Sequence, residues 1–193
     1  MHAIQAIRPA MNVLKKISTS LPGVFILEPR VFGDERGFFF ESYNQQRMAE
    51  VGIVETFVQD NHSCSSHNVL RGLHYQVKHP QGKLVRVVEG EILDVAVDLR
   101  RRSATFGRSE VVRLSGDNKR MLWIPIGLAH GFRVLSDQAH VLYKATDFYA
   151  PEHERTLAWN DPDLNINWEL DGEPIVSAKD QQGVAFRNAG YYE

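Results

Sequence analysis

Apolar residues alternate with other residues along much of this chain. In the segment 93–99, Leu-Asp-Val-Ala-Val-Asp-Leu, every odd position is large and apolar. Because successive side chains of a β-strand point to opposite faces, this pattern predicts a strand with its odd positions on one buried face. Similar short runs occupy residues 24–27, 37–41, 70–76, 83–88, 109–114, 120–124, 130–134 and 140–148.

Turn-forming residues separate these runs. They are Gly33-Asp34, Pro80-Gln81-Gly82, Glu89-Gly90, Ser115-Gly116-Asp117-Asn118 and Ser136-Asp137. Many short strands divided by regular turns are typical of a β-sandwich or jelly roll. Helix signals are scarce, and the best candidate runs from Gln45 to Val51, with Asn44 or Ser42 as N-cap and Gly52 as the stop. The pattern therefore predicts an all-β protein with a few short helices.

A length of 193 residues fits one domain. We interpret residues 1–20 as an N-terminal arm and residues 181–193 as a C-terminal tail of a single domain, 1–193. From Pro151 onward the sequence loses its periodicity and is rich in Pro, Asn, Asp and Trp. This last part is expected to wrap around the sheets in loops and short turns.

The composition disfavours several classes of partner and location. The 22 Lys and Arg residues nearly balance the 24 Asp and Glu residues, so no global charge favours nucleic acid or an anionic membrane as a partner. An anionic ligand would have to be bound by a local cluster. The one cysteine, Cys64, excludes an internal disulfide, and no run of about 18 apolar residues occurs. We expect a cytoplasmic protein.

Four residues are candidates for acid–base chemistry. His74 lies in the strand predicted at 70–76, and a catalytic imidazole needs a carboxylate that holds one tautomer. Asp161 and Asp180, both after Pro151, are candidates for that carboxylate, and spacing does not decide between them. Tyr143 is a candidate proton donor. The simpler interpretation is that His74 is a core histidine satisfied by a backbone carbonyl.

Lys83 and several other basic residues are candidates for binding negative charge. Lys83 follows the Pro80-Gln81-Gly82 turn and begins an apolar strand, so its ammonium could stabilise an enolate oxygen at the mouth of the barrel. An ordinary exposed lysine is the alternative. A phosphate cluster could form from Arg36, Arg71, His130 and Lys179, since arginines beside glycine can present both guanidinium nitrogens to phosphate oxygens.

Two segments resemble the motifs of a cupin-type jelly-roll β-barrel. A metal-holding cupin usually supplies His-x-His and a Glu from its first motif and a His from a Pro-x-Gly-x-x-His second motif. The second motif is intact from Pro125 to His130, but the first has Gln76 in place of its second histidine and Lys83 where the carboxylate is expected. An ammonium beside two imidazoles repels a divalent cation and attracts an anion. The resemblance therefore implies no metal, with a metal-dependent cupin enzyme as the alternative.

A longer set of motifs resembles the dTDP-4-dehydrorhamnose 3,5-epimerase family. These motifs are residues 34–39, 59–61, 71–74, 81–83, 125–127, 130–132, 143–144, 149–152, 159–162 and 177–180. They run in order from about Leu21 to Asp180, nearly the whole chain. The resemblance implies a homodimer that inverts C3 and C5 of dTDP-4-dehydro-6-deoxy-D-glucose without a cofactor.

The resemblance also implies roles for single residues. His74 corresponds to the general base, Asp180 to its carboxylate, Tyr143 to the acid on the opposite face of the sugar, and Lys83 to the group that steadies the enolate oxygen. The residues that correspond to nucleotide-sugar contacts are Arg36, Glu41, Gln59, Asn61, Arg71, His130, Tyr149, Glu154 and Lys179, with Tyr149 stacking on thymine. Some contacts in this family, including the segment from Arg36 to Glu41, come from the partner subunit.

Three alternatives remain open at this point. A related enzyme could epimerise only C3 or only C5, or act on another deoxysugar. A metal cupin, such as a dioxygenase or a sugar-phosphate isomerase, is a second possibility. A sugar-nucleotide binding module without catalysis is the third, although it would not need both His74 and Tyr143.

Overall fold

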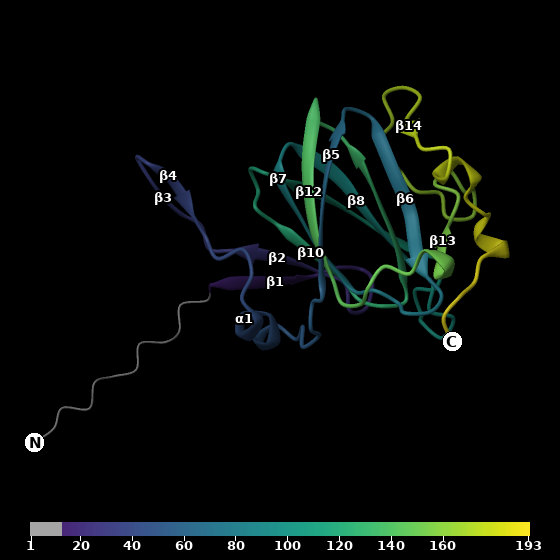
Figure 1. Cartoon of the computed structure of the whole chain (residues 1–193), viewed down its shortest axis with the longest axis horizontal. Helices are drawn as coiled ribbons and strands as arrows, with labels where there is room; N and C mark the ends of the chain where they lie inside the picture. The colour runs from purple at the N-terminus through teal and green to yellow at the C-terminus, as the bar shows by residue number, and fades with distance from the viewer. Residues whose placement is uncertain (1–12) are drawn as a thin grey trace, which may run out of the picture.

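Two antiparallel sheets face each other in the computed structural model, which describes residues 13–193 (Figure 1). The first sheet contains, in order, β1 (Leu14–Ser18), β2 (Phe25–Pro29), β10 (Met121–Ile124), β7 (Lys83–Glu89), β12 (Gln138–Ala145) and β5 (Gln59–Ser66). The second contains β13 (Glu154–Thr156), β6 (Val69–Gln76), β11 (Leu128–Val134), β8 (Glu91–Asp98) and β9 (Ser109–Ser115), and β14 (Ile175–Val176) pairs parallel with β6. The predicted jelly roll with few helices is confirmed.

The main core lies between the two sheets. Val85 and Val87 of β7 and Val141 of β12 meet Ile92 and Ala96 of β8 in one buried cluster. These are alternate positions on each strand, as the period of two requires. Burying their aliphatic groups provides the main driving force for closing the sandwich.

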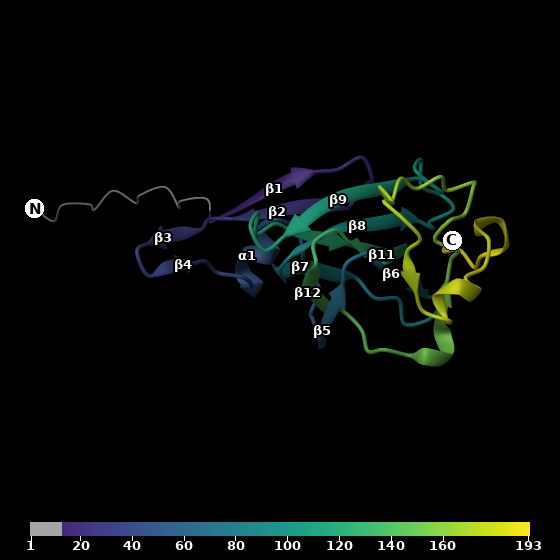
Figure 2. The same ribbon diagram turned by 90° about the horizontal axis from the view of Figure 1, so that it is seen from above.

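A second apolar layer covers the outer face of the second sheet. Val95, Val97 and Leu99, the odd positions that the sequence placed on one buried face, pack against Leu157 and Trp168 of the tail. The even positions of β8 face the main core, so both faces of this strand are buried. The tail from Pro151 thus covers the sheet, as predicted, and it gathers at one end of the sandwich (Figures 1 and 2).

The helix α1 (Gln45–Glu50) covers the outer face of the first sheet. Asn44 is its N-cap, because the Asn44 side-chain oxygen accepts the backbone N–H groups of Gln46 and Arg47 at 2.9 and 3.3 Å. Met48 is buried against Leu27 and Trp123 of the sheet. The predicted helix, including one of its two proposed caps, is confirmed.

A hairpin of β3 (Phe32–Asp34) and β4 (Gly37–Phe39) extends away from the sandwich (Figures 1 and 2). Its phenylalanines are largely exposed: Phe38 is 60 % and Phe39 73 % accessible. Aromatic side chains gain little from folding when they stay in water, so this hairpin is suited to contact another surface.

Several short elements of the structure were not predicted from the sequence. In the predicted arm, residues 1–12 lie outside the described residues, whereas residues 14–18 form β1, paired with β2. The strands β3, β5, β13 and β14 were also not predicted, since polar residues dominate β5 and the other three have at most three residues. The predicted turn at Gly33-Asp34 is wrong, because both residues pair with β4 and the turn follows at residues 35–36. Three 3₁₀ turns, η1 (Pro151–His153), η2 (Asp180–Gln182) and η3 (Phe186–Asn188), complete the tail. Residues 13–193 contain no helix with the length and apolar character that crossing a membrane would require.

A close backbone approach joins β6 to β11 at two glycines. A Cβ atom on Gly131 would lie 2.6 Å from the carbonyl oxygen of Arg71, and one on Gly72 would lie 2.5 Å from the Cα of Gly131. Only glycine fits at either position without moving a strand. Gly72 also has a φ of +119°, which L side chains rarely adopt.

Gly131→Ala should therefore destabilise the protein by roughly 1–3 kcal/mol, because the methyl group meets fixed backbone. Urea denaturation followed by circular dichroism measures this change in the free energy of unfolding. Gly33→Ala is the matched control, since its nearest neighbour is 3.7 Å away, and we expect a change of no more than about 0.5 kcal/mol. Equal stability of Gly131→Ala and the unmutated protein would contradict the close approach.

Candidate active site

A pocket of about 320 Å³ opens between the two sheets. The first sheet contributes Gln59 and Asn61 of β5, Lys83 of β7 and Tyr143 of β12, while the second contributes Arg71 and His74 of β6, His130 of β11 and Glu154 of β13. Tyr149, in the loop after β12, also lines the pocket. Nine of the predicted site residues are thus brought together from segments far apart in the sequence.

An irregularity in β6 decides which side chains face this pocket. His130 of β11 is opposite His74, but Phe132, two residues further, is opposite Arg71, three residues back on β6. This β-bulge inserts one extra residue into β6. Arg71 and His74 are three residues apart, so regular alternation would place them on opposite faces of the strand, but the bulge places them on the same face. Both side chains therefore line the pocket.

His74 forms a dyad with Asp180. Its Nε2 lies 2.6 Å from Oδ1 of Asp180, and the other carboxylate oxygen accepts the backbone N–H of Gly72 at 3.3 Å. Burial acts to raise the pKa of the Asp180 carboxyl, but the hydrogen bond and charge of His74 outweigh it, and the pKa lies below its ordinary value. An Nε2–H donated to an ionised Asp180 leaves Nδ1 of His74 as the basic nitrogen.

Asp161, the other candidate carboxylate, forms hydrogen bonds within the tail and not with His74. Its two oxygens accept backbone N–H groups from Asp163 at 2.8 Å and Phe186 at 2.7 Å. These bonds hold the segments around Asp163 and Phe186 together. The choice that spacing left open is therefore decided in favour of Asp180 as the residue that contacts His74.

Lys83 is a half-buried cation that lines the pocket. Burial lowers the pKa of its ammonium to about 8, although the charges of Asp94 and Glu154 oppose this shift. The Lys83 Nζ lies 5.6 Å from the centroid of the Tyr143 ring. An ammonium in this setting is close to its titration point and poorly hydrated, which strengthens its attraction for a developing oxyanion.

Asp94 is a site residue that the sequence did not predict. Its two oxygens lie 3.1 and 2.9 Å from Nε2 of His130, and its side chain is fully buried. Asp94 belonged to the polar positions of the 93–99 pattern, which were not assigned to any site. An aspartate in the middle of an apolar strand is itself a signal, because a buried carboxylate needs a partner.

His130 therefore differs from the predicted phosphate cation. Burial lowers its pKa, and the charges of Lys83 and His74 add to this, against the opposing effect of Asp94. A neutral imidazole that donates Nε2–H to Asp94 presents Nδ1 as an acceptor. It fits a hydroxyl group of a ligand better than a phosphate.

Tyr143 stands on the sheet opposite His74. Burial raises the pKa of its hydroxyl, and the charge of Glu154 raises it further, while Arg71 opposes the shift. The phenol thus keeps its proton near neutral pH and can donate it. A base and an acid are thereby presented from facing sheets to the space between them.

Three residues form a polar cluster at the rim. Tyr149 Oη donates to Glu154 at 2.7 Å, and Lys179 forms an ion pair with the same carboxylate oxygen. Burial acts to raise the pKa of Glu154, but the hydrogen bonds from Lys179 and Tyr149 prevail and lower it. The Tyr149 ring is 50 % exposed and available to stack on a planar group.

Gln76 fixes the loop that carries Tyr149. Its Nε2 donates to the carbonyls of His79 at 2.6 Å and Phe148 at 3.3 Å, and its Oε1 accepts the N–H of Ala150 at 2.9 Å. The residue that replaces a metal-binding histidine of the cupins is thus fully engaged as a structural amide. Among residues 13–193, no three His, Cys, Asp or Glu side chains are grouped so that they could hold a metal ion.

Four predicted site residues do not line this pocket: Asp180 and Lys179 contact the lining residues His74 and Glu154, whereas Arg36 and Glu41 do not. Arg36 is on the β3–β4 hairpin, where its guanidinium bonds to Asp34 at 3.1 and 2.5 Å. Glu41 follows β4 and accepts a hydrogen bond from Asn44 at 3.0 Å. Neither side chain lines the pocket, so a single chain does not bring them to His74.

Two buried polar atoms in the pocket have no partner within the described part of the chain. They are Nδ2 of Asn61 and Oγ of Ser63, neighbours on the inner face of β5. Unpaired polar groups in a cavity favour a ligand with hydroxyl or carbonyl groups. Ser63 was not predicted, because one serine in a polar strand carries no distinctive signal.

Comparison with known proteins connects this geometry to one family. The family model for dTDP-4-dehydrorhamnose 3,5-epimerase matches residues 18–188. The chain is also 59 % identical over 177 residues to the enzyme of that name from Pseudomonas aeruginosa, covering 91 % of this chain and 98 % of the relative. This chain belongs to the dTDP-4-dehydrorhamnose 3,5-epimerase family.

Solved structures of related epimerases have the same fold. The dTDP-6-deoxy-D-glucose-3,5-epimerase RmlC from Legionella pneumophila, in complex with dTDP-4-keto-L-rhamnose, is 49 % identical and has a TM-score of 0.90. The match covers 92 % of this chain and 95 % of that one. ChmJ, a 3'-monoepimerase from Streptomyces bikiniensis in complex with dTDP-quinovose, is 32 % identical with a TM-score of 0.81, and the match covers 86 % and 85 % of the two chains. The family predicted from the sequence is confirmed.

If Lys83 must be protonated for catalysis, kcat/KM should fall as the pH rises through about 8, since the ammonium loses its proton above its lowered pKa. A pH–rate profile from pH 6 to 10 measures this. Lys83→Met should lower kcat/KM by about 10²–10³-fold, and its residual activity should lack the fall near pH 8. The same alkaline fall in Lys83→Met would assign it to another group.

Proposed function

We propose that this chain inverts C3 and C5 of dTDP-4-dehydro-6-deoxy-D-glucose and yields dTDP-4-dehydro-L-rhamnose. The observation that carries the proposal is the pairing of His74, on one sheet, with Asp180 of the tail, opposite Tyr143 on the other sheet and with Lys83 in the same pocket. Epimerisation next to a ketone needs one base, one acid on the other face and one cation. The family membership supports the same reaction.

In the proposed first step, Nδ1 of His74 removes the proton at C3. The electrons of the broken C–H bond move into the ring and leave negative charge on the 4-oxygen, giving an enolate. The Lys83 ammonium then stabilises this charge, and Asp180 stabilises the imidazolium that forms on His74. No redox cofactor is called for, because the 4-keto group already acidifies the neighbouring carbon.

In the second step, Tyr143 returns a proton to C3 from the opposite face, which inverts the centre. Its raised pKa favours the neutral phenol that this step requires. The 4-ketone acidifies C5 in the same way as C3. One set of residues can therefore treat both carbons in turn, provided that His74 first releases its proton to water, Tyr143 regains one from water, and the sugar ring is repositioned between the two inversions.

The nucleotide would bind at the rim of the pocket. Tyr149 offers an exposed ring for the thymine base, and Arg71 offers a guanidinium whose Nε is held by Ser65 at 3.0 Å. Lys179 is close by, paired with Glu154. Binding energy from these remote contacts can be used to orient the sugar against His74.

We also propose a homodimer in which the β3–β4 hairpin of each subunit completes the pocket of the other. The support is physical: the hairpin extends into solvent with exposed phenylalanines, and it carries Arg36 away from its own pocket. The cytoplasmic location stays a prediction from the composition.

Deuterium exchange tests the reaction itself. In deuterated water, with dTDP-4-dehydro-6-deoxy-D-glucose as substrate, NMR should show solvent deuterium at both C3 and C5 of the product. His74→Ala should lower both exchange rates by about 10²–10⁴-fold while dTDP affinity is retained, since the base is lost but not the nucleotide site. Tyr143→Phe should allow exchange but slow inversion. Deuterium at C3 alone would favour a 3-epimerase, the activity named for ChmJ.

Subunit complementation tests the shared site. Arg36→Ala and His74→Ala are each expected to be weakly active, but unfolding and refolding them together should restore up to about one quarter of the normal activity. Half of the dimers are then mixed, and each mixed dimer has one intact site. The matched control mixes His74→Ala with Lys83→Ala, whose defects lie in the same pocket, and should restore nothing. Equal activity of the two mixtures would show that sites are not shared.

A further inference from the structure

A buried arginine lies between the second sheet and the tail. Arg133 is on the outer face of β11, and its side chain is 2 % exposed. Its Nε donates to Oδ1 of Asn68 at 2.9 Å, and its Nη1 donates to the carbonyls of Trp168, at 3.1 Å, and Glu169. Its Nη2 pairs with Asp171. A guanidinium buried in this way holds a defined arrangement of acceptors around it.

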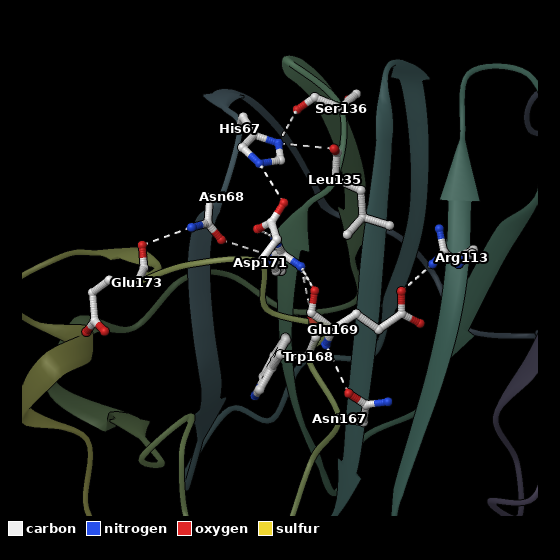
Figure 3. A network of polar contacts seen from close by, with 11 residues as sticks. His67, Asn68, Arg113, Leu135, Ser136, Asn167, Trp168, Glu169, Asp171 and Glu173 are labelled. Atoms are coloured by element: carbon white, nitrogen blue, oxygen red, sulfur yellow. Dashed lines mark hydrogen bonds and ion pairs between the residues drawn. The ribbon is translucent and has the colours of Figure 1, made fainter.

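Asn68 connects this arginine to the next part of the tail. It occupies the turn between β5 and β6 with a φ of +61°. Its Nδ2 donates to the carbonyl of Glu173 at 2.8 Å, and its backbone carbonyl accepts the N–H of Ile175 at 3.0 Å. Figure 3 shows the Asn68 side chain directed at Glu173, with Asp171 beside it and His67 above, bonded to Asp171 at 3.2 Å.

The segment held by Asn68 leads along β6 to Asp180. Ile175 and Val176 pair in parallel with Val69 and Leu70, the residues that follow Asn68. Asp180 then meets the N–H of Gly72 and the ring of His74, further along the same strand. The tail therefore pairs with the start of β6 in a fixed register at residues 175–176 and then turns into η2, which begins at Asp180. The pairing at residues 175–176 thus fixes where the turn that carries Asp180 begins.

A second attachment follows Asp180. The N–H of Val184 donates to the carbonyl of Thr156 at 2.9 Å, and the carbonyl of Val184 accepts the N–H of Ala158 at 2.8 Å. Asp180 thus lies between two points at which the tail is attached to the second sheet, at Asn68 and at Val184. The second is made by backbone groups alone, whereas the first adds the side chains of Asn68 and Arg133 to the backbone bond between Ile175 and Asn68.

We propose that Asn68 and Arg133 are positioning residues for Asp180: they fix the tail at the start of β6 and so hold the Asp180 carboxylate against His74. Neither residue lines the pocket. The inference rests on the proposed function, because it takes His74 and Asp180 as the catalytic pair. Loosening the first attachment lets the segment 175–180 shift along β6, and a shift of about 1 Å is enough to slow a reaction substantially.

A double-mutant cycle tests this proposal through the rate of deuterium incorporation at C3. Asn68→Gly removes both side-chain bonds, and glycine tolerates the positive φ of this position. Asn68→Gly should slow exchange about tenfold in the otherwise unmutated enzyme. In an Asp180→Asn background, measured over hours at high enzyme concentration, the same substitution should change the rate less than about twofold, because the group it positions is already gone.

Two further variants complete the design. Arg113→Gln is the matched control, since Arg113 pairs with Glu169 of the same loop from the exposed side (Figure 3) and should leave the rate unchanged. Asn68→Asp is nearly isosteric, keeps the acceptor for Arg133 and loses the donor to Glu173, so it replaces Asn68→Gly in the cycle should the glycine variant not fold. The affinity for dTDP should be unaffected in both Asn68 variants.

The outcomes separate this proposal from the proposed function. An equal loss of rate in both backgrounds, or no loss in either Asn68 variant, would overturn the positioning role while exchange by the unmutated enzyme leaves the function intact. Absence of exchange at C3 and C5 in the unmutated enzyme would instead overturn the proposed function.

Discussion

The close approach of β6 and β11 at Gly72 and Gly131 is the constraint on which the rest of the site depends. With no Cβ atoms between them, the two strands can accommodate the extra residue of the β6 bulge. The bulge turns Arg71 and His74 to the same side, and the N–H of Gly72 becomes a donor for Asp180. A larger residue at either glycine would separate the strands and remove the geometry that pairs His74 with its carboxylate.

Charge balance inside the pocket follows from burial. Lys83 faces a low-dielectric interior in which Asp94 and Glu154 each favour its charged form, and burial still lowers its pKa to about 8. His130, between Asp94 and Lys83, has a lowered pKa for the same reason. The pocket therefore places the Lys83 ammonium near the neutral imidazole of His130. An ammonium in a low-dielectric site strongly stabilises a developing oxyanion.

The tail both covers the outer face of the second sheet and carries Asp180. Its apolar side chains, such as Leu157 and Trp168, cover the outer face of β8, and its polar groups attach it to β6 in register. Because Asp180 is carried by this tail, burial of the outer apolar layer and assembly of the dyad are coupled. The stability of the second sheet and the placement of the carboxylate that contacts His74 are thus parts of one packing arrangement.

Local sequence patterns were sufficient for several features: the strand at 93–99, the helix capped by Asn44, the jelly-roll class and, through ordered motifs, the family. Each depends on residues near one another in the chain, where strand alternation and helix capping act directly. Asp94 was missed because its role depends on His130, a partner on a different strand, and the strands β13 and β14 exist only because β6 is there to pair with them.

The sequence by itself determined which chemical groups this protein possesses: an imidazole, a phenol, an ammonium and carboxylates in segments with a strong strand pattern. Only the tertiary structure decided how they pair. It selected Asp180 over Asp161 as the partner of His74, placed Arg71 beside His74 through the bulge, and kept Arg36 away from the pocket of its own chain. The physical reason is that hydrogen bonding and burial act over a few ångströms in space, whereas the groups concerned are separated by up to 106 residues along the chain.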